Sequence, residues 1–162
     1  MSAHSLNLLD TSGILLPKDA CVVIIRTEWN DHINGALEEG CKRILKEHQI
    51  KYKTLMVPGA IEIPFCIKRY WDKCCLHSLT DRPHAFIALG CVLRGDTPHF
   101  EYVCQAVTTG IVQLNLQLPI PTIFGVLTVN DEQQALERTG GRHGHKGEEA
   151  AITALKMMSL DL

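Results

Sequence analysis

Hydrophobic residues along the chain fall into short continuous runs, separated by longer segments in which apolar and charged residues are mixed. The run ACVVII at residues 20–25 is typical of a strand buried on both faces. Strands are predicted at residues 20–25, 52–57, 85–93 and 122–127. From residue 32 to residue 47, apolar residues recur at helical spacing with charged residues between them. Helices are predicted at residues 32–47, 61–75, 100–116, 131–138 and 146–158.

The order of these elements predicts the fold class. Strands that alternate with helices form parallel sheets with helical crossovers, so we expect an α/β protein. Its architecture is predicted to be a three-layer α/β/α sandwich with a four-stranded parallel sheet of the flavodoxin-like type. Residues 19–162 are expected to form one domain, preceded by an N-terminal arm at residues 1–18. Ligands of such sheets bind beyond the carboxyl ends of the strands, so the loops there are the candidate site.

Composition narrows the class of protein. The chain has 162 residues, of which 46% are hydrophobic and 21% charged, values that suit a single globular domain. Its net charge of -2 gives no attraction to nucleic acid or to an anionic membrane. No apolar stretch is long enough to cross a bilayer. The N-terminus lacks the features of a secretory signal, so the cytoplasm is the expected location.

The seven cysteines are an odd number and include no C-x-x-C pair. Reduced thiols in a cytosol fit this usage better than disulfides or a metal site, and no metal is expected. Small core positions are predicted for Cys21, Cys66, Cys91 and Cys104.

The loop after the third predicted strand, RGDTPHF at residues 94–100, holds more polar chemistry than a turn requires. Thr97 is predicted to cap the next helix, and Pro98 to occupy its first position. A helix N-terminus attracts anions, phosphate above all, so this loop is a candidate anion site. The structural alternative is a capped helix start in which Arg94 pairs with Asp96.

Three further side chains near strand ends carry candidate chemistry. His99 would lie in the first helical turn, where the dipole disfavours its protonated form and leaves a neutral base beside an anion. Trp29 offers a flat ring for stacking a heteroaromatic ligand, or else packs on a neighbouring side chain at the rim. Glu62 either binds hydroxyl groups of a ligand or is a first-turn carboxylate favoured by the helix dipole.

Motifs of other nucleotide-binding folds are missing. The chain has no G-x-x-x-x-G-K-[ST], and no G-x-G-x-x-G follows its first predicted strand. The loop RTEWN at residues 26–30 also differs from the Ser-, Thr- and Gly-rich loop of a flavodoxin-like electron carrier.

The strand exits together resemble one known family, the lumazine synthases of riboflavin biosynthesis. The similarity covers residues 21–155 and rests on WN at 29–30, VPGAIEIP at 57–64, GCVLRGDTPHFEYV at 90–103, FGVLT at 124–128, QQALER at 133–138 and KGEEAA at 146–151. The third and fourth of these blocks are highly specific. Two residues depart from the usual pattern: Ile61 stands where many members have an aromatic residue, and Trp29 where many bacterial members have phenylalanine.

The resemblance implies a reaction without metal or organic cofactor. Members condense 5-amino-6-(D-ribitylamino)uracil with 3,4-dihydroxy-2-butanone 4-phosphate to 6,7-dimethyl-8-ribityllumazine, releasing phosphate and two waters. It implies that Trp29 stacks on the pyrimidine and that His99 transfers protons. The other positions implied are Ala60, Ile61 and Glu62 for the ribityl chain and ring, Cys91, Val92 and Leu93 for the ring pocket, Asp96 and Thr97 for the phosphate, and Phe124 and Arg138 to complete the pocket, Arg138 at the phosphate.

The resemblance also implies partners. Family members form homo-pentamers in which Phe124 and Arg138 reach the pocket of the adjacent subunit, and some pentamers build 60-subunit icosahedral shells. The short connection at residues 140–145 favours the shell here. Riboflavin synthase is a candidate partner. The alternative function is a non-catalytic relative that binds flavin or lumazine or forms a shell, which the presence of His99, Arg138 and Glu62 disfavours.

Overall fold

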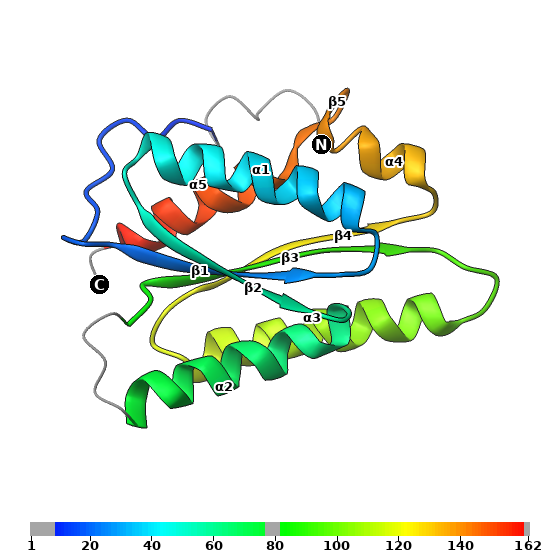
Figure 1. Cartoon of the computed structure of the whole chain (residues 1–162), viewed down its shortest axis with the longest axis horizontal. Coiled ribbons are helices and arrows are strands. Elements are labelled where there is room, and N and C mark those ends of the chain that lie inside the picture. The colour runs from blue at the N-terminus through cyan, green and yellow to red at the C-terminus, as the bar shows by residue number, and fades with distance from the viewer. Residues whose placement is uncertain (1–8, 77–81, 161–162) are drawn as a thin grey trace.

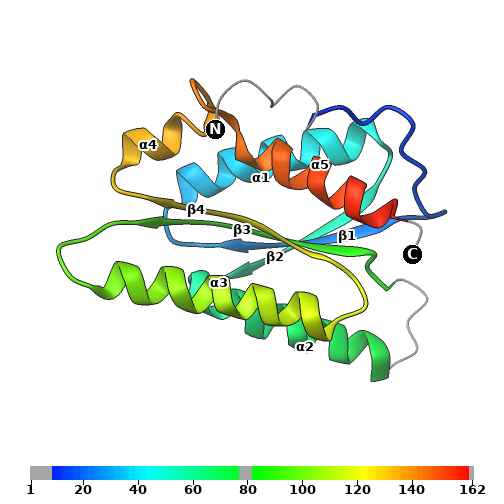
Figure 2. The same cartoon turned by 180° about the vertical axis from the view of Figure 1, so that it is seen from behind.

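The computed structural model describes residues 9–76 and 82–160. Its centre is a four-stranded parallel sheet in the order β2-β1-β3-β4. The strands are β1 (Cys21–Thr27), β2 (Lys51–Val57), β3 (Ala85–Leu93) and β4 (Thr122–Val129). Helices cover both faces of this sheet (Figure 1 and Figure 2), which confirms the three-layer α/β/α sandwich predicted from the sequence.

Each face of the sheet is covered by a pair of helices. Helices α1 (Asp31–Glu47) and α5 (Lys146–Met158) lie on one face, and α2 (Ile63–Leu76) and α3 (His99–Gln117) on the other. Successive strand residues point to opposite faces, so Ile24 joins the core under α1 and α5, while Val23 joins the core under α2 and α3. Burial on both faces explains why these strands read as continuous apolar runs. No helix in the described ranges is long and apolar enough to cross a membrane.

Glycines let the helices of each layer approach closely. A Cβ atom on Gly147 of α5 would lie 1.9 Å from the backbone oxygen of Leu37 in α1. On the other face, a Cβ atom on Gly110 of α3 would lie 2.5 Å from Cγ of Pro64. Pro64 lies in the first turn of α2, as predicted. This contact packs the start of α2 against α3 and so helps to place the loop that precedes α2.

Short elements near the carboxyl edge of the sheet differ from the sequence predictions. A 3₁₀ turn, η2 (Ala60–Glu62), follows β2, and α4 (Glu132–Leu136) is shorter than the predicted segment 131–138. The segment expected only as a break between helices forms an antiparallel hairpin of β5 (Thr139–Gly141) and β6 (Gly144–His145). Gly140 and Gly144 have φ angles of 110° and 81°, so this turn depends on glycine.

Residues 9–20 contain turns but neither helix nor strand. Ile14 and Leu16 pack against the core under α1 and α5. Oγ1 of Thr11 lies 3.1 Å from Nε2 of His48, just beyond the end of α1. This part of the predicted arm is therefore held against the domain, and residues 1–8 lie outside the described residues.

The prediction for the cysteines is right for Cys91, which is buried, and wrong for three others. Those that are only half-buried are Cys21, Cys66 and Cys104. Cys21 is the first residue of β1, and the other two lie on helices at the boundary between core and solvent. Cys41 and Cys74 occupy buried positions instead. No three His, Cys, Asp or Glu side chains of the described residues are grouped so that they could hold a metal ion.

Candidate active site

The carboxyl ends of the four strands bring the predicted loops to one edge of the sheet (Figure 1). Backbone hydrogen bonds join neighbouring loops there. Glu28 N donates to the carbonyl of Val57 at 2.9 Å, which connects the exits of β1 and β2. Arg94 N donates to the carbonyl of Val129 at 2.9 Å, which connects the exits of β3 and β4.

Asn30 joins the exits of β1 and β3. Asn30 directly precedes α1, but no side chain caps the helix. Asn30 has a φ of 60°, and its Nδ2 donates to the carbonyl of Cys91 at 2.9 Å. All four strand exits therefore form one connected edge.

Trp29 and Glu62 lie around the same glycine. A Cβ atom on Gly59 would be 3.0 Å from Oε2 of Glu62 and 3.7 Å from Cδ1 of Trp29. Trp29 is 73% exposed and Ile61 is 48% exposed, whereas Ala60 is half-buried. The structure thus brings the predicted stacking ring together with the predicted ribityl-binding residues, open to solvent at the carboxyl edge.

The end of β3 forms an apolar wall at this edge. Cys91 is buried, and Val92 and Leu93 are half-buried. Burial, and to a lesser extent the Glu132 carboxylate, raises the pKa of the Cys91 thiol to about 11. The thiol is therefore neutral near pH 7 and acts as an apolar contact, not as a nucleophile.

The loop between β3 and α3 differs from its prediction in how the helix begins. Helix α3 starts at His99, Pro98 is the residue before it, and no side chain caps it. Thr97 is not the cap, because the carbonyl of Pro98 accepts the first helical hydrogen bonds, from Glu101 N at 3.1 Å and Tyr102 N at 3.5 Å. The first N–H groups of α3 have no helical carbonyl to bond, so this helix start still suits an anion.

Arg94 does not pair with Asp96, so the structural alternative for this loop is wrong in that pairing. It forms an ion pair with Glu101 in α3, and its Nε donates to Oδ1 of Asn130 at 2.9 Å. Its guanidinium carbon lies 4.2 Å from the centroid of the Phe100 ring. The long Arg94 side chain reaches across the loop to partners that its position in the sequence does not reveal. The hydrogen bond from Arg94 lowers the pKa of Glu101.

Asp96, Thr97 and His99 are exposed in this loop and at the helix start. Their side chains make no hydrogen bond or ion pair with another residue of the described ranges. Polar side chains that the fold does not use are free to contact a ligand. Their roles toward phosphate and in proton transfer stay predictions.

Phe124 and Arg138 lie apart from these residues. Both line a groove of about 1200 Å³ along β4, which is an edge strand of the sheet. Phe124 is 41% exposed, and Nη1 of Arg138 donates to the carbonyl of Gln134 at 2.8 Å. Neither Trp29 nor His99 lines this groove. The structure therefore places the predicted site residues in two groups, one at the carboxyl edge and one along β4.

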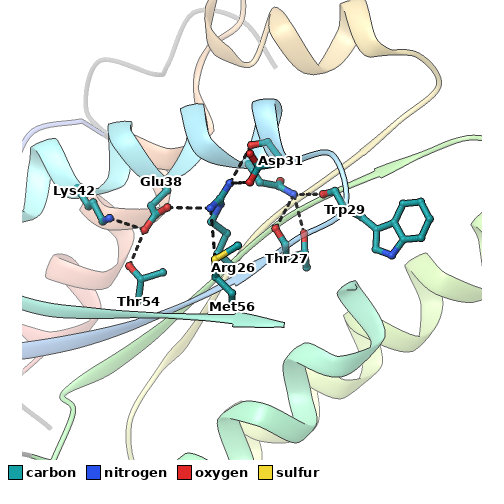
Figure 3. A network of polar contacts seen from close by, with 9 residues as sticks. Arg26, Thr27, Trp29, Asp31, Glu38, Lys42, Thr54 and Met56 are labelled. Carbon is teal, nitrogen blue, oxygen red and sulfur yellow. Dashed lines mark hydrogen bonds and ion pairs between the residues drawn. The ribbon is translucent and has the colours of Figure 1, made fainter. Parts of the chain in front are cut away.

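Sequence reasoning missed two buried polar side chains near Trp29: Arg26, which Figure 3 labels, and Asn34, whose Nδ2 donates to the carbonyl of Trp29. Arg26 is 8% exposed and Asn34 is fully buried. Nδ2 of Asn34 donates to Oγ1 of Thr27 at 2.7 Å. The signals that could have found them are a cation near the end of an apolar strand and an amide beside Ile33 on a buried helix face.

Comparison with known proteins identifies the family. The 6,7-dimethyl-8-ribityllumazine synthase family matches the chain over residues 19–161. A curated relative of that name from Parabacteroides distasonis is 47% identical, over 96% of this chain and 95% of its own length. Relatives of the same name from Porphyromonas gingivalis and Phocaeicola vulgatus are 43% and 42% identical, over 98% and 96% of this chain and 96% and 90% of their own lengths. The chain belongs to the 6,7-dimethyl-8-ribityllumazine synthase family.

Proposed function

We propose that this chain condenses 5-amino-6-(D-ribitylamino)uracil with 3,4-dihydroxy-2-butanone 4-phosphate, releasing 6,7-dimethyl-8-ribityllumazine, one phosphate and two waters. Membership of the family supports this reaction. The observation that carries it in the structure is that Trp29 and Glu62 both lie within 4 Å of where a Cβ atom on Gly59 would be, at the same edge from which α3 starts. The site matches the parts of the two substrates. Its stacking ring suits the pyrimidine, its carboxylate suits the ribityl hydroxyls, and its helix start suits the phosphate.

Each part of the site has one chemical task. The Trp29 ring stacks on the pyrimidine, and Glu62 accepts hydrogen bonds from the ribityl hydroxyls. The 5-amino group attacks the ketone carbon of the second substrate, and loss of water gives a Schiff base. Elimination of phosphate, with loss of a proton from the neighbouring carbon, leaves an enol that becomes a ketone. The nitrogen that bears the ribityl chain attacks this ketone carbon and closes the ring with loss of the second water. His99 takes up and returns protons in these steps.

The phosphate of the four-carbon substrate lies at the first turn of α3 in this proposal. Backbone N–H groups and the helix dipole both favour an anion there. Thr97 adds a hydroxyl donor from the turn that precedes α3. Asp96 lies in the same turn. Arg138 of a neighbouring subunit completes the site, since a guanidinium can bind two phosphate oxygens at once.

Replacement of His99 by alanine tests the proton-transfer role. General acid–base groups contribute about 10²–10⁴-fold to rate. We expect His99→Ala to lower turnover by about 10²-fold, the lower end of that range, because the remaining site still aligns both substrates. Binding of a ribityl-bearing analogue, measured by calorimetry, should change little. His48→Ala, at the far end of α1, is the matched control and should keep full turnover.

A fluorescence assay for the lumazine product separates the enzyme from a non-catalytic relative. Pure protein that forms no lumazine above background from the two substrates would leave flavin binding or shell formation as the function. Loss of analogue binding in His99→Ala as large as its loss of turnover would show that His99 is structural.

We further propose that the chain forms homo-pentamers in which a neighbour completes each site. The groove that Phe124 and Arg138 line, away from His99, supports this assembly. Large apolar side chains are also exposed on α2 and α3: Phe65, Leu76, Tyr102, Val112 and Leu116. Exposed apolar side chains and an open strand edge both favour contact with another chain.

The tight hairpin between α4 and α5 predicts the size of the assembly. Residues 139–145 form two short strands around a glycine turn and carry no insertion. We therefore expect 60-subunit icosahedral shells, and a short insertion after Arg142 should yield free pentamers. Light scattering in neutral buffers measures the mass of both proteins. A pentamer mass for the unmodified chain in every buffer would contradict this expectation.

The setting of the enzyme is also part of the proposal. All seven cysteines are free thiols, a state that the reducing cytoplasm preserves, so we place the chain there. Riboflavin synthase, which would consume the lumazine, is the proposed protein partner. Co-sedimentation of the two purified proteins tests this association.

A further inference from the structure

A polar network centred on buried side chains ends at Trp29 (Figure 3). At its centre is Asn34, a fully buried residue in the first turn of α1. Its Nδ2 lies 2.7 Å from Oγ1 and 3.3 Å from the carbonyl oxygen of Thr27, and it donates to the carbonyl of Trp29. Three oxygens around one nitrogen fix the orientation of this amide.

The opposite end of the same amide is not satisfied. Oδ1 of Asn34 is buried and has no hydrogen-bond partner within the described residues. An unpaired buried acceptor carries a desolvation cost, whereas an apolar side chain of similar shape would avoid it. Stability of the core therefore does not by itself explain an asparagine at this position. What the amide does provide is a rigid link between α1 and the turn that carries Trp29.

Arg26 holds the helix that follows this turn. It is 8% exposed, and its Nη2 donates to the carbonyl of Asp31 at 3.0 Å and forms an ion pair with the Asp31 carboxylate. Its Nη1 lies 3.5 Å from Oε2 of Glu38. Glu38 in turn accepts from Lys42 and Thr54, at 2.6 and 2.7 Å. The end of β1 and the first turn of α1 are thus fastened to each other on both sides of Trp29.

Trp29 combines a fixed backbone with a free ring. Its N–H donates to the carbonyl of Pro58 at 3.3 Å, and its own carbonyl accepts from Asn34. The indole is 73% exposed and points away from the network (Figure 3). A ring on a fixed backbone loses less freedom when a ligand stacks on it, and this improves binding without a new contact.

We propose that Asn34 is a positioning residue for the Trp29 ring, supported by Arg26 through Asp31. This inference rests on the proposed function, in which Trp29 stacks on the pyrimidine. Asn34 is not a catalytic residue, since it touches the ring-bearing turn and not the substrate. Loss of its amide should weaken binding of the pyrimidine substrate and leave the handling of the phosphate substrate, at α3, nearly unchanged.

The test uses the full chain with Trp71→Phe, so that Trp29 is the only tryptophan. Asn34→Leu keeps the approximate shape and removes both donors, and Asn34→Thr restores one donor. With Asn34→Leu we expect the KM for the ribitylaminopyrimidine to rise about 10-fold, as loss of a buried hydrogen bond permits. The KM for the four-carbon phosphate should stay within about 2-fold. The fluorescence anisotropy decay of Trp29 should show added fast motion, and Asn34→Thr should recover part of both effects.

A stability control separates positioning from simple loss of fold. Leu45→Ala removes a fully buried side chain on the same helix, about 16 Å further along at 1.5 Å per residue. It should lower the melting temperature without changing Trp29 anisotropy or the split between the two KM values. The proposal would be overturned if Asn34→Leu and Leu45→Ala changed the Trp29 anisotropy equally and also changed the ratio of the two KM values equally.

A second variant covers the case in which Asn34→Leu does not fold. Asp31→Ala removes an exposed carboxylate and so loosens the Arg26 link without opening the core. It should raise the KM for the pyrimidine about 3-fold and increase Trp29 motion. Unchanged anisotropy in this variant would overturn the inference. Absence of turnover in the parent protein would instead refute the proposed function, and the anisotropy would still decide whether Asn34 holds Trp29.

Discussion

At the scale of single residues, the environment decides what each side chain can do. The cysteines show this clearly, because one chemical group occurs in several settings. Burial raises the pKa of the Cys41 thiol to about 12 and that of the Cys91 thiol to about 11. Cys75, in contrast, is exposed near the end of α2. Only thiolates react readily, so these settings predict different reactivities.

We expect Cys41 and Cys91 to resist alkylation in the native protein. With a pKa of about 11, roughly one Cys91 thiol in a thousand is ionised at pH 8, and access is also blocked. Brief treatment with iodoacetamide at pH 8, followed by peptide mass spectrometry, should label Cys75 first. Denatured protein is the control and should label all seven cysteines. Labelling of Cys91 in native protein as fast as Cys75 would show that the carboxyl edge is open down to β3.

The sequence predicted correctly where a residue lies when its position relative to a strand alone decides that location. Trp29 and Glu62 lie in the segments that follow β1 and β2, so the parallel sheet brings them to one edge. The partner of Arg94 could not be predicted, because Glu101 meets it only through the path of the loop and the start of α3 at His99. Asn34 could not be recognised either, since an asparagine on a helix carries no sign of which backbone atoms it will meet.

At the scale of elements, the hairpin of β5 and β6 is the largest departure from the predicted order. Short strands between glycines give no hydrophobic pattern, so the segment could only be read as a break. In the structure, the hairpin packs on α1 through His145. A Cβ atom on Gly40 would lie 2.1 Å from Cε1 of His145, and Nδ1 of His145 has no hydrogen-bond partner in the described residues.

This contact makes the stability of the fold depend on pH. Burial lowers the pKa of His145 below its usual 6.5, although the Glu148 carboxylate acts in the opposite direction. Below about pH 6.5 the unfolded chain binds a proton at this position before the folded chain does. The stabilising contribution of neutral His145 is therefore complete above pH 6.5 and is lost as the pH falls below it.

Urea unfolding at several pH values tests this dependence. We expect the midpoint to fall between pH 7.5 and pH 5.5, and to fall less steeply in His145→Gln, which does not titrate. Because other groups titrate alike in both proteins, the difference between the two curves isolates His145. The difference between the two proteins at pH 7.5, where His145 is neutral, gives the baseline for this comparison. Parallel curves for parent and His145→Gln would contradict the contribution of His145.

At the scale of the whole molecule, the two groups of site residues lie on different edges of one sheet. His99 begins α3 at the carboxyl edge, while Phe124 and Arg138 line the groove along β4. Arg138 follows a short helix and precedes a hairpin, so it stands at the margin of its own domain. A ring of head-to-tail contacts would place the β4 edge of one subunit against the carboxyl edge of the next.

Mixed assemblies give the sharpest test of a shared site. His99→Ala and Arg138→Ala proteins, each nearly inactive alone, are unfolded, mixed in equal amounts and refolded together. If Arg138 serves the neighbour's site, random assembly restores both native side chains at about one quarter of interfaces, one half times one half, because a closed ring fixes which faces meet. Activity should rise toward that fraction of the parent value. Refolding each variant alone is the control. If mass spectrometry confirms mixed oligomers and activity stays at the average of the two variants, His99 and Arg138 serve a site within one subunit.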